Sequence, residues 1–165
     1  MKIFRGRVCV LALSAVLAAG ASSSWANNLS VSNVALGARD TNANTVVVKF
    51  NVSWDNSWRN KINHDAVWLT VRLYDPGGVP VNKKLCRFSA AGVTPLGFSA
   101  GTQGGLELYV PTDKAGIFLR RSQNASPASV ATQGVQVVVD YSSCGFTSAD
   151  QIIASIFGLE MVYIP

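Results

Sequence analysis

The sequence predicts an all-β protein: an antiparallel two-sheet β-sandwich of the immunoglobulin-like kind, with about eight strands, preceded by a signal peptide. Three observations predict this fold. Several segments alternate apolar and polar residues with a period of two. Turn-forming residues separate these segments at regular spacing. No window keeps the apolar period of a helix. A closed β-barrel is the alternative architecture.

Residues 1–26 have the features of a secretory signal peptide. A basic start is followed by an apolar run over residues 8–19, and Ser24-Trp25-Ala26 supplies small residues at the cleavage positions. We expect the mature chain to begin at Asn27. An uncleaved membrane anchor is the alternative. After cleavage, residues 27–157 would form the sandwich domain.

Charge gives no sign of a nucleic-acid partner. The whole chain carries a formal net charge of +5, with 14 basic and 9 acidic residues. Lys2, Arg5 and Arg7 leave with the signal peptide, so 11 basic residues remain and the net charge falls to +2. Such a small, scattered charge is typical of an ordinary protein surface. No other apolar stretch is long enough to cross a membrane.

Four segments carry the strongest strand pattern. The clearest is Thr45–Trp54, where one face would hold Val46, Val48, Phe50, Val52 and Trp54. Ala66–Tyr74 and Gly134–Tyr141 repeat the alternation. In Ile152–Ile164, the residues expected on one side are Ile153, Phe157, Leu159, Met161 and Tyr163. We expect Met161 and Tyr163 to pack inward.

Shorter strands are predicted between these segments. Leu29–Leu36 is a first strand with an irregularity where its alternation slips, and the remaining weak strands are Val81–Phe88, Leu106–Val110 and Ile117–Arg121. Residues 90–105 are rich in Gly, Ala and Ser, which predicts a long surface loop.

Two cysteines remain after the signal peptide, Cys86 and Cys144. An exported chain reaches an oxidising compartment, where an even pair tends to close. We therefore expect a Cys86–Cys144 disulfide. Two separate thiols are the alternative.

The composition predicts no catalytic apparatus, no metal site and no cofactor. His64 is the single histidine, and its neighbours supply too few ligands for a transition metal. No nucleophile motif accompanies it. We interpret His64 as a loop residue packed near Trp58 or Trp68.

The richest local cluster lies between residues 54 and 68. One hypothesis makes it a ligand platform, because flat aromatic rings flanked by polar groups suit a sugar face; its residues would be Asp55, Trp58, Arg59, Asp65 and Trp68. The other hypothesis is structural: the tryptophans pack, Asp55 caps a turn, and Arg59 pairs with Asp55 or Asp65. Buried tryptophan beside a turn is the commoner use and favours the structural hypothesis.

Several blocks of this sequence resemble one family in the same order. The blocks are residues 28–34, 48–59, 65–68, 114–121, 134–137 and 157–165. Together they resemble the β-sandwich domain found N-terminal to formylglycine-generating-enzyme-like (sulfatase-modifying-factor) domains in secreted bacterial proteins. The sequence departs from that pattern at Cys86 and at 141–144.

The resemblance implies that residues 158–165 are the last strand and the junction to such an enzyme domain, none of which lies within this sequence. In that family the catalytic, copper-binding cysteines belong to the downstream domain, so no catalytic residue is carried over. The expected function is an exported non-catalytic accessory or interaction domain, truncated or freestanding. Its partner would be a formylglycine-generating-enzyme-like domain or another protein.

The alternative function is a carbohydrate-binding module that uses the Trp58/Trp68 region, with a glycan as partner. Either protein would be exported to the periplasm, the cell surface or the medium.

Overall fold

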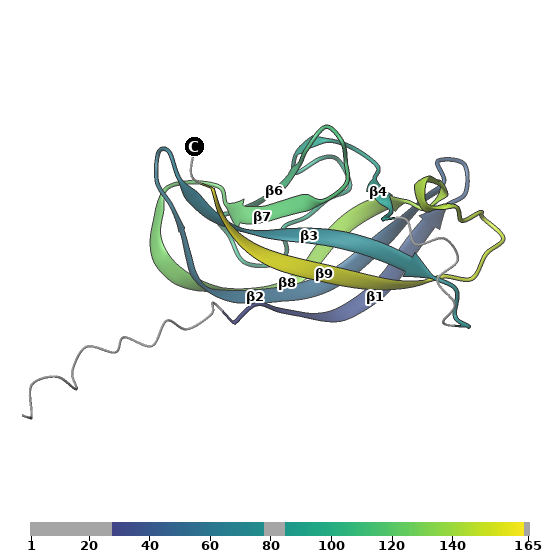
Figure 1. Cartoon of the computed structure of the whole chain (residues 1–165), viewed down its shortest axis with the longest axis horizontal. Coiled ribbons are helices and arrows are strands. Elements are labelled where there is room, and N and C mark those ends of the chain that lie inside the picture. Colours follow the sequence, from purple (N-terminus) through teal and green to yellow (C-terminus); the bar gives the residue numbers. More distant parts are fainter. Residues whose placement is uncertain (1–27, 78–84, 164–165) are drawn as a thin grey trace, which may run out of the picture.

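The structure, a computed structural model, describes residues 28–77 and 85–163 (Figure 1). The predicted signal peptide lies outside these residues. Within them, nine strands form one antiparallel sheet, which confirms the all-β, antiparallel prediction. The strands are β1 (Ser30–Asp40), β2 (Thr45–Arg59), β3 (His64–Tyr74), β4 (Arg87–Phe88), β5 (Gly92–Val93), β6 (Leu106–Val110), β7 (Ile117–Arg121), β8 (Ala125–Asp140) and β9 (Ile153–Tyr163).

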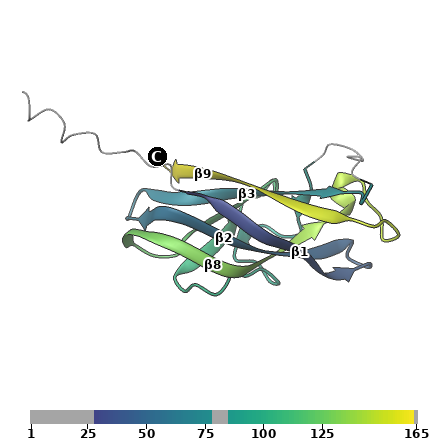
Figure 2. The same ribbon diagram turned by 90° about the horizontal axis from the view of Figure 1, so that it is seen from below.

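The sheet curls back on itself at the hairpin between β2 and β3. These two long strands pair only at Arg59 and His64, beside the turn. Beyond that point they diverge into two parts of the sheet, seen one above the other in Figure 2. We call β1, β2, β8 and β4 the β2 limb, and β9, β3, β7, β6 and β5 the β3 limb. The hydrophobic core lies between the limbs.

The core consists of the apolar faces that alternation predicted. In β2 every second residue from Val46 to Trp54 is buried, and in β3 the same holds from Val67 to Leu73. Val135, Val137, Val139 and Tyr141 are also buried. Burying one such side chain fully contributes roughly 1.5–3 kcal/mol relative to leaving it exposed, so these faces hold the limbs together.

Two strands are longer than predicted because irregular positions let them continue. β2 runs on to Arg59 through a register shift between Trp54 and Ser57, where Asn56 has a φ of 58°. β8 begins at Ala125, and residues 125–133 lack the clean alternation that would have revealed it. The irregularity predicted for the first strand is confirmed, since β1 shifts register after Ser32 and again after Leu36.

The prediction that Met161 and Tyr163 pack inward is wrong. They are 41% and 52% exposed, and they lie opposite Ala66 and His64 on the solvent side of β3. The inward positions of β9 instead include Gly158. A Cβ there would lie 3.0 Å from Leu29 Cδ2 and 3.3 Å from Leu69 Cδ2. The space beneath β9 is tight at Gly158, whereas Ile156 also faces in and packs against the core.

The predicted loop over residues 90–105 is more structured than expected. It contains β5, which pairs with β6, and Ser99 forms a bridge with Gln136. Phe98 is buried in the core. Gly101, at a φ of 89°, allows the close approach to β8, because a Cβ at this position would clash with Thr132 Oγ1. Of the predicted strand Val81–Phe88, residues 81–84 lie outside the described residues and β4 covers Arg87–Phe88.

The predicted disulfide is confirmed. Cys86 and Cys144 are bonded at an S–S distance of 2.07 Å, and both are buried. The bond ties the start of β4 to the short 3-10 turn Ser142–Cys144 that follows β8. It closes a loop with a sequence separation of 58.

We expect the double substitution Cys86→Ser and Cys144→Ser to lower the free energy of unfolding by about 4 kcal/mol, because closing a loop of this length restricts the unfolded chain. Urea titrations of both proteins would measure the loss. Reduction should add two hydrogens to the intact mass of the natural chain only. Equal urea midpoints with and without reductant would contradict this expectation.

Candidate functional site

The candidate site lies on the side of the β3 limb that faces away from the core, which we call the outer face. Strand register brings one row of large side chains together across four strands: Leu159 of β9, Trp68 of β3, Phe118 of β7 and Tyr109 of β6. The rings of Trp68 and Phe118 lie 4.4 Å apart between centroids. The row is a continuous apolar band across the sheet.

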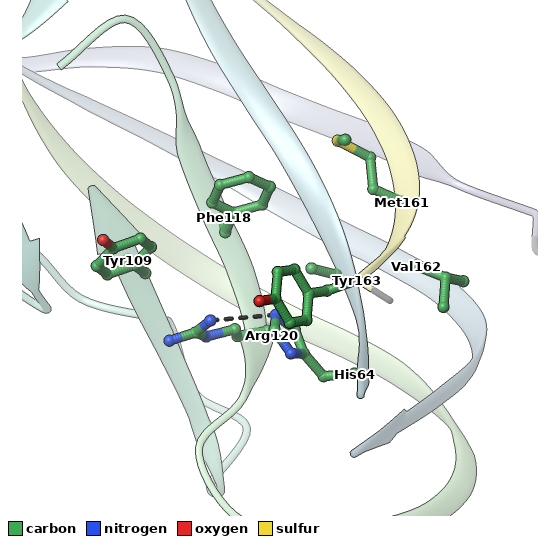
Figure 3. Close-up of a pocket in the computed structure, with 8 residues that line it drawn as sticks. His64, Tyr109, Phe118, Arg120, Met161, Val162 and Tyr163 are labelled. Carbon is green, nitrogen blue, oxygen red and sulfur yellow. Dashed lines mark hydrogen bonds between the residues drawn. The ribbon is translucent and has the colours of Figure 1, made fainter. Parts of the chain in front are cut away.

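The next row contains one small residue, and a hollow opens above it. Here Ala66 lies between Met161 of β9 and Arg120 of β7. Because a methyl group stands where its neighbours carry long side chains, a space of about 640 Å³ remains (Figure 3). Its lining is His64, Ala66, Tyr109, Phe118, Arg120, Met161, Val162 and Tyr163.

The walls of the hollow are rings in fixed pairs. His64 stacks on Tyr163, with centroids 5.0 Å apart and planes 20° from parallel. Tyr109 and Phe118 are 6.3 Å apart and 18° from parallel. The guanidinium of Arg120 lies 5.0 Å from the centre of the Tyr109 ring. Rings held in this way lose little freedom when a ligand contacts them.

A polar network closes one end of the hollow. Glu107 Oε1 accepts hydrogen bonds from Arg59 Nη1 at 2.9 Å and from Arg120 Nε at 2.8 Å. Arg120 Nη1 lies 3.1 Å from His64 Nε2, as drawn in Figure 3. A guanidinium can only donate, so this histidine nitrogen accepts and carries no proton. Two cations facing one carboxylate leave an unbalanced positive charge here.

The surroundings of His64 favour its neutral imidazole. Burial lowers the pKa of its imidazole, and the positive charges of Arg120 and Arg59 lower it further, against the opposing effect of Glu107. The nitrogen that faces the hollow is already hydrogen-bonded to Arg120. This arrangement can bind a ligand through its aromatic rings, through the methyl group of Ala66 and through one positive charge that Glu107 does not balance.

The apolar band continues along β9 beyond the hollow. The outward apolar residues of this strand, each between 41% and 61% exposed, are Ile153, Phe157, Leu159, Met161 and Tyr163. The Arg72 guanidinium lies 5.0 Å from the centre of the Phe157 ring. A contiguous apolar surface of this kind is typical of interaction sites.

The structure separates the residues predicted as one ligand platform. Trp68 lies on the outer face, and Arg59 reaches the end of the hollow through Glu107. Asp65 faces the core instead, where its Oδ2 accepts a hydrogen bond of 2.8 Å from Trp54 Nε1. The expected pairing of Arg59 with Asp55 or Asp65 is not what the structure shows.

The remaining predicted residues lie on β2. Asp55 accepts hydrogen bonds from Asn28 and Ser129, which lower the pKa of its carboxyl group. Trp58 is half-buried. His64 packs against Tyr163, whereas the sequence-based interpretation placed it near Trp58 or Trp68.

Sequence reasoning missed most of the hollow. Among the lining residues that it did not single out are Tyr109, Phe118 and Arg120, and it also missed the adjacent Glu107. All four lie in the strands predicted at Leu106–Val110 and Ile117–Arg121, so their outward positions could be read from alternation. Their neighbours across the sheet could not, because register between distant strands is a tertiary property.

Among residues 28–77 and 85–163, no three His, Cys, Asp or Glu side chains are grouped so that they could hold a metal ion. In the same part of the chain, no helix has the length and apolar character needed to cross a membrane.

Comparison with protein-family models, with curated proteins and with solved structures gave no match to this chain.

Asp65 provides a prediction about pH. Its Oδ1 is buried and makes no hydrogen bond with the described residues. The same holds for Oε1 of Glu160 on the neighbouring strand. Burial raises the pKa of the Asp65 carboxyl, and the charge of Glu160 raises it further, although the hydrogen bonds from the Trp54 indole and the Ala66 backbone oppose this. The folded state therefore favours the protonated acid. Its contribution to stability is present below the usual pKa of 3.8 and is lost as pH rises through the raised value.

We expect Asp65→Asn to be more stable than the natural chain at pH 7 by about 1 kcal/mol, the scale of one unpaired buried polar group. The amide keeps an oxygen for Trp54 and avoids the buried charge. The difference should shrink toward pH 4. Thermal unfolding of both proteins across this pH range would measure it, with Asp65→Ala as the control that loses the bond to Trp54. A constant difference at every pH would refute the assignment.

Proposed function

We propose that this chain is an exported, non-catalytic interaction domain that docks a protein domain through its outer face. In this proposal the two limbs of the curled sheet are the two layers of an immunoglobulin-like β-sandwich. The observation that carries the proposal is the apolar surface of β9, continuous with the ring-lined hollow. Soluble monomers rarely leave such a surface uncovered.

Export is supported from two directions. The first 26 residues have the pattern of a signal peptide. The disulfide between Cys86 and Cys144 is of a kind that persists in oxidising compartments. We infer that the mature protein acts outside the cytoplasm.

The partner we propose is a formylglycine-generating-enzyme-like domain that follows residue 165 in the same chain. The resemblance in the sequence suggests it, and the geometry is favourable. Tyr163 lies in the wall of the hollow. The described part of the chain therefore ends at the outer face. Under this proposal the sandwich positions the enzyme domain and takes no part in its chemistry.

A glycan-binding role is the second candidate. The row of Trp68, Phe118 and Tyr109 favours it, because sugar faces stack on exposed rings. The separation of Asp55 and Asp65 from this row speaks for the protein partner instead.

We expect Leu159→Lys to uncouple the two domains, since it places a charge at the centre of the apolar surface. Hydroxyl-radical footprinting of Trp68, Met161 and Tyr163 would be compared between residues 27–165 and the longer chain that this proposal requires. The longer chain should show severalfold slower labelling, and Leu159→Lys should abolish that protection. Leu96→Lys is the matched control, because this fully exposed leucine lies in the loop between β5 and β6, outside the strands that form the outer face. Equal labelling in both chains, or a stop codon after Pro165, would overturn the proposed partner.

We also expect no retardation of this protein in native gels that contain polysaccharides. If retardation occurred, was lost in Trp68→Ala and persisted in Trp58→Ala, with both variants folded by circular dichroism, the glycan-binding role would replace the protein-docking role.

A further inference from the structure

The hollow above Ala66 has a composition that defines the chemistry of its occupant. Its floor is a methyl group, and most of its wall is aromatic or aliphatic. Because these rings are already held in pairs, an apolar group can pack against them without rearranging them. The part of the occupant that enters most deeply is therefore an apolar side chain.

Charge defines a second requirement at the same place. Arg59 and Arg120 bind the same oxygen of Glu107, at 2.9 and 2.8 Å. His64 adds no charge because its hollow-facing nitrogen accepts from Arg120. The other acidic groups of this region do not compensate: Asp65 points to the core, and Glu160 lies opposite Val67, on the core side of β9. One positive charge thus remains unbalanced at the end of the hollow.

These two features are adjacent, because Arg120 both lines the hollow and belongs to the charged network. A peptide ligand that fills the apolar hollow and also balances the positive charge must carry its apolar group and its negative charge within one residue of each other. Charge complementarity at a rim of this type favours the correct partner over others of similar shape.

We propose that the hollow is an anchor site for a segment of a partner protein in which a large apolar side chain stands next to a carboxylate. This inference rests on the proposed function, because it takes the occupant to be a protein. It adds the chemistry by which the outer face would recognise that partner.

Met161 gives the site its own spectroscopic probe. The sequence contains two methionines, Met1 and Met161, and the second lines the hollow. A chain labelled with carbon-13 at the methionine methyl therefore reports on the hollow through one internal signal. Titration of this signal measures binding directly.

The probes are three acetylated and amidated tetrapeptides. Their sequences are glycine-phenylalanine-glutamate-glycine, the same peptide with glutamine for glutamate, and the same peptide with alanine for phenylalanine. We expect the first to shift the Met161 signal in a saturable way. Loss of the ring should weaken binding about tenfold or more, as expected for one buried apolar side chain. Loss of the charge should weaken it about threefold to fivefold, as expected for a solvent-accessible ion pair.

Variants separate the two requirements. Ala66→Leu fills the hollow and should abolish the shift. Arg120→Gln leaves Arg59 balanced by Glu107, so the preference for glutamate over glutamine should disappear while the preference for the ring remains. Arg72→Gln is the matched control, because this arginine lies on the outer face beside Phe157, outside the hollow. It should bind all three peptides as the natural chain does.

The outcomes distinguish this inference from the proposed function. Equal shifts from the phenylalanine and alanine peptides, or equal affinity for glutamate and glutamine in the natural chain, would overturn the anchor site even if Leu159→Lys uncouples the domains. Discrimination among the peptides without any footprint protection would support the anchor site and count against the proposed cis partner. If Ala66→Leu does not fold, the Arg120→Gln result decides.

Discussion

The pairing of β9 with β3 along the full length of both strands decides which side chains of β9 meet solvent. Once Tyr163 lies opposite His64, every second residue of β9 is committed to one face. Gly158 then falls beside Leu29 and Leu69, where an added Cβ would make tight contacts with both side chains. Phe157, Leu159, Met161 and Tyr163 are directed outward, and together with Trp68, Phe118 and Tyr109 they give the outer face its apolar character.

The same register creates the hollow. Ala66 is flanked by Met161 on one side and Arg120 on the other, and rows of rings lie before and after it. A single methyl among large side chains leaves space that the rest of the sheet does not fill. An apolar surface that remains exposed costs roughly 25 cal/mol for each Å² that a partner could cover, which gives docking its driving force.

Buried polar groups set the boundary between the two sides of β3. Asp65 faces inward and is held by the Trp54 indole, whereas His64 faces outward and is held by Arg120. The side chains of these consecutive residues thus lie on opposite faces, as the pleat of a strand requires. The cluster of polar and aromatic residues that looked continuous in the sequence is divided by this alternation.

The sequence by itself determined the all-β class, the buried faces of β2, β3 and β8, and the disulfide. These features depend on period-two alternation and on cysteine number, which are local or compositional properties. Only the tertiary structure decided which face of β9 turns inward, that residues 90–105 join the sheet, and that Arg59 binds Glu107. Alternation shows that residues share a face but carries no information about which face it is, because that depends on the strand packed beneath. Cross-strand register joins residues far apart in the chain, so no pattern within one segment can specify it.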